Sequence, residues 1–196
     1  MIIHTMDQGS EDWVKVKTGK FSATRIKKLF MSESTAGYQD IIYKVAYERL
    51  TGKPTEEDFK NKWMDYGTET EPISRKNYEL TNFVKIKQVG FIELDDWVGI
   101  SPDGLIGENV LWETKCQKYN THMKQLRTGN IPIEYYRQVQ AQLYVTERKY
   151  CIYYAYHPEI KPIEKEIYRD EAIIKQIKHK INNAKNQVLE IIKEVA

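Results

Sequence analysis

The first eighty residues carry apolar side chains mainly at helical spacing, which predicts a helical N-terminal part. Ser10, with two acids behind it, is typical of a helix N-cap, and Gly19 indicates where that helix stops. A second short helix is expected to begin near Ser22. The third is indicated by apolar residues three or four positions apart that end at the sequence TGKP: Ile41, Ile42, Val45, Ala46 and Leu50. A fourth helix is predicted from about residue 62 to residue 80, with Pro72 marking a kink or a restart.

From residue 83 onward the sequence acquires the composition and alternation of strands. Residues 83–94, the sequence WVGISPD and the sequence NVLWETKC are predicted to form three strands, the last two around a turn at 104–109. We expect these strands to pair in order as a three-stranded meander.

The remaining pattern predicts helices over 120–128 and 133–145, a strand at YCIYYAY and a long amphipathic helix that closes the chain. The apolar stripe of that closing helix consists of Ile173, Ile174, Ile177, Ile181, Ala184, Val188, Ile191 and Val195. We interpret the stripe as core, with a subunit contact as the alternative. This order of elements predicts an α/β fold in which a mixed sheet is flanked by helices on both sides.

The size and composition of the chain fit one domain. With 196 residues, of which 41% are hydrophobic and 30% charged, it can bury a full core. We expect a single domain over 1–196, made of a helical part (1–80), a sheet with its helices (81–160) and a C-terminal helix (169–196). No segment has the length and apolar character of a signal peptide or a bilayer span, so we expect an intracellular, cytoplasmic protein without a membrane partner. Its cysteines, Cys116 and Cys151, are too few for a disulfide framework.

Charge is distributed unevenly along the chain, although the net charge is only +2. Positions 15–28 hold six basic residues and no acid, whereas positions 91–114 hold six acids and no basic residue. The small net charge argues against a tail that coats nucleic acid indiscriminately. A basic face beside an acidic focus is what a polyanionic substrate and a cation-dependent centre would require. Two solvated surface patches are the plainer alternative.

The candidate chemistry lies in the sequence GISPDGLIGENVLWETKC. Alternate residues of a strand share a face, so Glu113 and Lys115 should point the same way, and Asp103 can approach that face if the strands pair. Two neighbouring carboxylates repel unless a cation neutralises them, and hard oxygen ligands favour Mg²⁺ or Mn²⁺. Such an ion activates water and stabilises charge on a phosphoryl oxygen, and Lys115 adds a positive charge. We interpret the group as a centre for phosphodiester hydrolysis; a solvated hairpin with a surface Glu–Lys pair is the alternative.

These residues resemble the motif of the PD-(D/E)-x-K nuclease superfamily, and the chain as a whole resembles the YqaJ-type viral recombinases, the phage lambda exonuclease family. Five sequence blocks occur in the family's order from residue 8 to about residue 159: QGSEDWVKVKTGKFSAT, GTETEP, SPDGL with LWETKC, YRQVQAQLYVT, and YYAYHPE. The resemblance implies a restriction-endonuclease-like core. It also implies Mg²⁺-dependent digestion of double-stranded DNA from 5′ ends, which leaves 3′ single strands for recombination by annealing.

The resemblance also implies roles for individual residues. The implied catalytic residues are Asp103, Glu113, Glu71, Lys115 and Gln138, and the implied metal ligands are Asp103, Glu113, Glu71 and the backbone carbonyl of Thr114. Without the resemblance, Glu71 would be interpreted as the partner of Arg75 four residues on. The implied contacts to DNA phosphates are Lys17, Ser22, Thr24 and Arg25, with a capped, solvated helix start as the alternative.

Two of these positions depart from the family's pattern, which has an arginine where this chain has Lys17 and a serine where it has Thr24. A lysine keeps the positive charge but lacks the bidentate fork of arginine. We therefore expect a looser grip on the 5′ end of the DNA, with hydrolysis itself unaffected.

The partners that the resemblance implies are double-stranded DNA ends, a single-strand annealing protein and further copies of the chain in a ring such as a trimer. The implied setting is a phage or prophage in a bacterial host. Two other functions stay open: a structure-specific or restriction-like endonuclease on the same core, and an inactive module that binds DNA ends. Closed circular DNA separates the first from an exonuclease, which leaves it intact. The presence of Asp103, Glu113 and Lys115 argues against the second.

Overall fold

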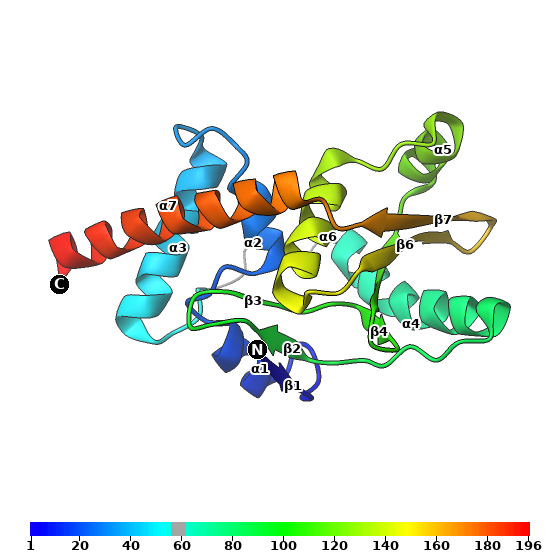
Figure 1. The fold of residues 1–196 in the computed structure, drawn as a ribbon, viewed down its shortest axis with the longest axis horizontal. Helices are drawn as coiled ribbons and strands as arrows, with labels where there is room; N and C mark the ends of the chain where they lie inside the picture. Colours follow the sequence, from blue (N-terminus) through cyan, green and yellow to red (C-terminus); the bar gives the residue numbers. More distant parts are fainter. Residues whose placement is uncertain (56–61) are drawn as a thin grey trace.

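The computed structural model describes residues 1–55 and 62–196, without the side chains of 62–65 and 68, and includes every predicted site residue. Its elements in chain order are β1 (Ile2–His4), α1 (Glu11–Lys17), α2 (Ala23–Lys28), α3 (Ala36–Thr51), α4 (Lys62–Asn82), β2 (Phe91–Glu93), β3 (Gly99–Ile100), β4 (Gly104–Ile106), β5 (Val110–Cys116), α5 (Tyr119–Thr128), α6 (Ile133–Thr146), β6 (Tyr150–His157), β7 (Ile160–Tyr168) and α7 (Glu171–Val195). The predicted mixture of helices and strands is confirmed (Figure 1).

The N-terminal helices begin where the cap residues predicted. The Ser10 hydroxyl accepts a hydrogen bond from the Trp13 N–H, and Ser22 caps α2 in the same way. Helix α3 ends at Gly52, whose φ of 67° is the left-handed conformation that favours glycine. Helix α4 continues through Pro72 without a restart.

The strands form two sheets, so the prediction of one meander was wrong. One sheet has the order β1-β2-β3 and the other the order β4-β5-β6-β7, with β5 and β6 parallel and the other pairs antiparallel. The break between the sheets lies at Pro102 and Asp103. Proline has no N–H to donate to a ladder, and the Asp103 carboxylate accepts the hydrogen bond of the Thr114 N–H. Pairing with β5 therefore begins after Asp103.

The predicted helices on both sides of the mixed sheet are confirmed. On one face, Tyr78 of α4 packs against Trp112 and Tyr154, with ring centroids 5.9 and 4.9 Å away. On the other face, α6 contacts β5 through hydrogen bonds to Glu113. Helix α7 runs across α3, and Figure 1 shows the C-terminus at the far end of that crossing.

The C-terminal helix buries most of its predicted stripe. The fully covered members are Ile174, Ile177, Ile181, Ala184 and Val188. Ile177, Ile181, Ala184 and Val188 belong to the main hydrophobic core, so the interpretation as core is confirmed for this part of the stripe. Val195, at the end of the helix, is 63% exposed.

Three strands were not predicted: β1, β7 and β4, which occupies part of the predicted turn at 104–109. Strand β1 is three residues long, and β7 buries only Ile163 and Ile167 among its nine residues. As an edge strand with lysines and glutamates between its apolar positions, β7 lacks the strict alternation that indicates a strand.

Candidate active site

Asp103 and Glu113 lie opposite each other across the β4–β5 pair. Gly104 pairs with Trp112, so one further step along both strands places Asp103 opposite Glu113 on the same face. The Thr114 N–H donates to Asp103 Oδ2 over 2.8 Å and fixes this carboxylate at the start of β4. A Cβ on Gly104 would lie 2.1 Å from Ile86 Cγ2, so the first position of β4, next to Asp103, needs a glycine. The structure thus brings the two acids together, although through β4 rather than through the predicted strand that ends at Asp103.

Glu113 is a buried carboxylate, with 1% of the residue exposed, and it accepts hydrogen bonds at both oxygens. Oε1 accepts from the Lys115 ammonium and from Gln138 Nε2, the latter over 2.7 Å. Oε2 accepts from Gln142 Nε2 over 2.8 Å. A buried charge needs such partners, and two amides one helical turn apart set the plane of the carboxylate.

Lys115 shares the face of Glu113, as predicted, and stays charged despite its burial. Burial by itself lowers the pKa of Lys115, but the carboxylates of Glu113 and Asp103 raise it by more, so the net shift is upward. Its Nζ lies 5.6 Å from the centre of the Tyr135 ring. A fixed ammonium therefore stands beside the two acids.

Glu71 joins this group from α4 while it is also paired with Arg75. Arg75 Nη2 donates to Glu71 Oε1 over 2.9 Å, which is the plain ion pair expected from the spacing. The pKa of Glu71 is nevertheless raised, first by burial and then, against the effect of Arg75, by the charge of Glu113. Ser74, one turn along α4, lies 2.7 Å from Thr114 through their hydroxyl oxygens. Helix α4 thus docks on β5 beside the acids.

The acids of this group fit a divalent cation. Burial raises the pKa of Asp103 well above its ordinary value, and the charges of Glu113 and Glu71 raise it further. A bound cation would relieve this repulsion, and Mg²⁺ takes one or two carboxylates together with waters and phosphate oxygens. Among the described residues, no three acidic, histidine or cysteine side chains are grouped closely enough to hold a metal ion as they stand. The ligand roles of Asp103, Glu113, Glu71 and the Thr114 carbonyl stay predictions.

The four residues predicted to contact DNA phosphates differ in their exposure and in their contacts. Thr24 is exposed on α2. Ser22 is 7% exposed and caps that helix, with its hydroxyl accepting from the Arg25 N–H. Lys17 Nζ lies 4.2 Å from the ring centre of Trp13. The Trp13 ring N–H donates over 2.8 Å to the Ser101 hydroxyl, two residues before Asp103. This hydrogen bond links α1, which carries Lys17, to the segment that leads into Asp103.

Arg25 is directed into the protein. Its guanidinium donates to both oxygens of Glu48, over 2.7 and 2.6 Å, and to the Lys20 carbonyl over 3.0 Å. A bidentate pair of this kind fixes the guanidinium and uses its donors. The structure does not bring Arg25 together with the acids, and its contact to a DNA phosphate stays a prediction.

Two residues of the site were missed in the sequence. Gln142 follows Gln138 by four residues and therefore lies on the same face of α6, a spacing that could have identified it. Lys27 belongs to the basic run, and its Nζ donates to Gln138 Oε1 over 3.1 Å. Burial and the charge of Lys115 lower the pKa of Lys27. The pairing of α2 with α6, which brings Lys27 in, is a tertiary contact that the local pattern does not contain.

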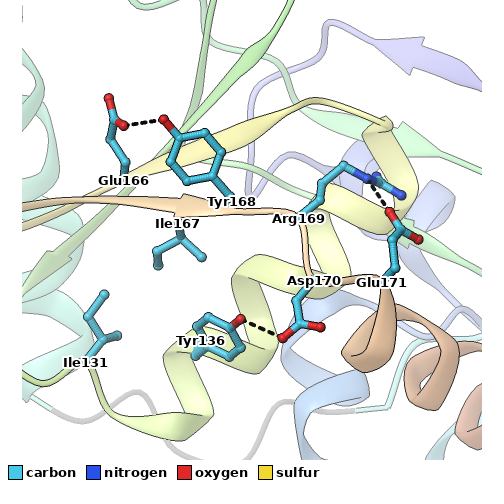
Figure 2. Close-up of a pocket in the computed structure, with 8 residues that line it drawn as sticks. All are labelled: Ile131, Tyr136, Glu166, Ile167, Tyr168, Arg169, Asp170 and Glu171. Carbon is cyan, nitrogen blue, oxygen red and sulfur yellow. Dashed lines mark hydrogen bonds and ion pairs between the residues drawn. The ribbon is translucent and has the colours of Figure 1, made fainter.

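A surface hollow of about 530 Å³ beside the start of α7 is separate from these acids. Figure 2 shows that its own acids are paired: Asp170 accepts from Tyr136, Glu166 from Tyr168, and Glu171 from Arg169. Asp170 also caps α7. This hollow is therefore explained by the packing of α6, β7 and α7.

A mixed sheet that presents two carboxylates and a lysine on one face, with a helix-borne acid nearby, is the arrangement expected for the PD-(D/E)-x-K class. Residues 12–149 match the YqaJ-like viral recombinase domain, and the chain belongs to this family.

Solved structures support the same relationship. The alkaline exonuclease LHK-Exo from Laribacter hongkongensis is 29% identical, with a TM-score of 0.87 that covers 95% of this chain and 96% of that chain. Its complex with dAMP is equally similar. A phage-related exonuclease from Haemophilus somnus has a TM-score of 0.68 and 16% identity, over 90% of this chain and 96% of that one, and shows the shared fold alone.

A curated relative, an uncharacterised protein of Acanthamoeba polyphaga mimivirus, is 26% identical over 164 residues. The match covers 76% of this chain and 29% of that protein, so the chain spans less than a third of the relative's length. Within the described residues, every helix is too short or too polar to cross a membrane.

Proposed function

We propose that this protein is a metal-dependent exonuclease that degrades one strand of double-stranded DNA from its 5′ end and leaves a 3′ single strand for recombination by annealing. The observation that carries the proposal is the group of Asp103, Glu113 and Lys115 on one face of the mixed sheet. Support comes from membership of the YqaJ-like family and from the similarity to LHK-Exo, which is an alkaline exonuclease and has been solved with dAMP.

Each residue of the site would have its own role in hydrolysis. Asp103 and Glu113, with Glu71 and the Thr114 carbonyl, would hold Mg²⁺ or Mn²⁺ against the scissile phosphate. The cation supplies charge neutralisation there and lowers the pKa of water. Lys115 places an ammonium group where negative charge grows on the phosphoryl oxygens. Gln138 and Gln142 hold the Glu113 carboxylate in one orientation.

The proposal also includes how the protein binds the DNA end and how its copies associate. Lys17 and Thr24 would contact the phosphates of the 5′ end, and the partners would be an annealing protein and further copies of the chain. Exposed apolar residues on α3 and α7 support a surface for another protein chain: Tyr43, Tyr47, Leu50, Leu189 and Val195. Light scattering of the purified protein measures the number of subunits.

The test offers the protein linear and covalently closed duplex DNA with Mg²⁺. We expect the linear DNA to shorten from its 5′ ends while the closed circles stay intact, and Asp103→Asn to remove the degradation. Asp40→Asn, an exposed acid of α3, is the matched control and should degrade DNA normally. Cutting of closed circles would favour the endonuclease alternative. Degradation that survives in Asp103→Asn would contradict the assignment of the site.

A further inference from the structure

Helix α5 presents an exposed surface that the proposed active site does not use. Tyr119, Met123 and Leu126 are spaced four and three residues apart and form one stripe; they are 69%, 53% and 37% exposed. The side of the helix that packs on the protein is buried at His122 and Gln125. The apolar stripe therefore faces solvent rather than the core.

A basic stripe lies next to the apolar one. Arg127 follows Met123 by four residues and Lys124 by three, so the two basic residues form a row beside the apolar stripe. Within the part of the chain that the structure describes, neither side chain is paired with an acid. The sequence from Lys115 to Ile133 contains four basic residues and no acid. The charge of this surface is therefore complementary to a polyanion.

A groove of about 460 Å³ continues the surface from α5 to β7 and the end of α4. Leu126 lines it together with Lys161 and Lys165 of β7. The two elements are joined there, because the His122 ring N–H donates over 2.7 Å to the Lys161 carbonyl. Glu164 is the acid in the groove, and its carboxylate accepts a hydrogen bond from the Tyr78 hydroxyl. The lysines thus extend the basic surface beyond the helix.

This surface lies close to the proposed catalytic centre. Helix α5 begins four residues after Lys115, and an extended chain covers at most about 3.6 Å per residue. The Cα atoms of Lys115 and Tyr119 are therefore within about 14 Å, a length of about four nucleotides at the rise of duplex DNA. The groove lies on the face of the sheet that α4 covers, where Tyr154 packs, so a strand would have to pass the end of β5 from the Glu113 face to enter it.

Exposed aromatic and apolar side chains beside basic ones are suited to single-stranded nucleic acid. Unpaired bases stack on such side chains while lysine and arginine contact the phosphates. In duplex DNA the bases stack on each other and are not available to Tyr119. We propose that α5 and the adjoining groove bind the undigested single strand as it leaves the active site, an inference that rests on the proposed exonuclease function.

The test measures binding without hydrolysis, by fluorescence anisotropy of a labelled thymidine oligonucleotide on full-length protein carrying Asp103→Asn in EDTA. Adding Tyr119→Ala should weaken single-strand binding roughly 5- to 150-fold, the loss of one stacked base. Lys124→Gln with Arg127→Gln should lower the slope of log K against log salt by about 1.4. Matched controls are Tyr168→Ala, an aromatic at the end of β7 that is 60% exposed, and Lys175→Gln with Lys193→Gln on α7.

The outcomes separate this inference from the proposed function. If both α5 variants bind the single strand as tightly as the Asp103→Asn parent does, the inference is overturned. The apolar stripe would then be a surface for a protein partner. An equal loss of single-strand and duplex binding would also overturn it, because the surface would then be a general phosphate contact. Failure of the unmodified protein to degrade linear duplex DNA would instead count against the exonuclease function. Circular dichroism verifies that the exposed substitutions leave the fold intact.

Discussion

At the scale of single residues, the orientation of Gln142 is set by the charge of Glu113. A carboxylate accepts hydrogen bonds and cannot donate them, so the amide nitrogen must face Glu113 Oε2. The amide oxygen of Gln142 is then buried with no hydrogen-bond partner among the described residues. Leaving such an atom without a partner costs about 1–3 kcal/mol. Oε1 of Glu113 has two donors and Oε2 has one, so Oε2 keeps room for a cation.

Replacement of Gln142 by alanine should therefore weaken the metal site. We expect a loss of roughly 10- to 100-fold in metal affinity or activity, which is usual when a partner of a metal ligand is removed. The Mg²⁺ concentration that gives half-maximal degradation of linear duplex DNA reports the metal affinity during the reaction. Calorimetric titration with Mn²⁺ measures the metal affinity directly, without a need for catalysis. Gln140→Ala is the control, since Gln140 lies on the same helix but bonds to Tyr168 and Asp170. Equal effects of the two substitutions would mean that Gln142 is merely structural.

At the scale of elements, α2 and α3 are joined by the buried pair of Arg25 and Glu48. Burial alone raises the pKa of Glu48, but the hydrogen bonds and charge of Arg25 lower it by more, to about 2. Glu48 also accepts from the Gly19 N–H over 2.8 Å, so it fixes the chain between α1 and α2. The same contact explains why Arg25 turns away from the acids of the site.

Glu48 is expected to stabilise the protein at neutral pH and to lose this effect in acid. Its folded-state pKa lies below its ordinary value, so the stabilisation is complete above about pH 4.5 and is lost as the pH falls toward 2. Glu48→Gln should lower the free energy of unfolding at pH 7 by about 3 kcal/mol and flatten its pH dependence in that window. Urea unfolding at several pH values measures both. The exposed Glu108→Gln should leave the curve unchanged; an identical acid slope in Glu48→Gln would contradict the assignment.

Elements also differ in how well their sequences predict them. Helix α1 was predicted at both ends because Ser10 and Gly19 act through local hydrogen bonds and backbone conformation. Strand β7 was not predicted, because it is stabilised by pairing with β6 rather than by its own alternation. The meander was wrong for a related reason: strand composition identifies strands but does not select their partners, and Pro102 with Asp103 diverts the chain into a second sheet.

At the scale of the whole molecule, α7 connects the helical part to the core that carries the sheet. Ile177 is completely buried in the cluster that also contains residues of α3 and β6, such as Val45 and Tyr153. Because this cluster joins the helical part to the sheet, we predict that the chain unfolds in one step, as one domain.

Ile177→Ala should lower the free energy of unfolding by about 2–5 kcal/mol, the usual result of removing a buried side chain that neighbours do not replace. Tryptophan fluorescence and far-ultraviolet circular dichroism should report the same denaturant midpoint, before and after the substitution. Leu189→Ala, on the same helix but 45% exposed, should change that midpoint much less. Separate midpoints for the two probes would indicate that α7 and the sheet unfold independently, against a single domain.

The sequence by itself determined the helices, the two central strands β5 and β6 of the catalytic sheet, and the shared face of Glu113 and Lys115. These features depend on local backbone preference and on the period of side chains along one element. Tertiary structure decided which strands pair, that Asp103 stands opposite Glu113, that Gln142 and Lys27 join the site and that Arg25 binds Glu48. Those contacts form between elements far apart in the chain, and their energies depend on burial and charge that exist after the elements have packed together.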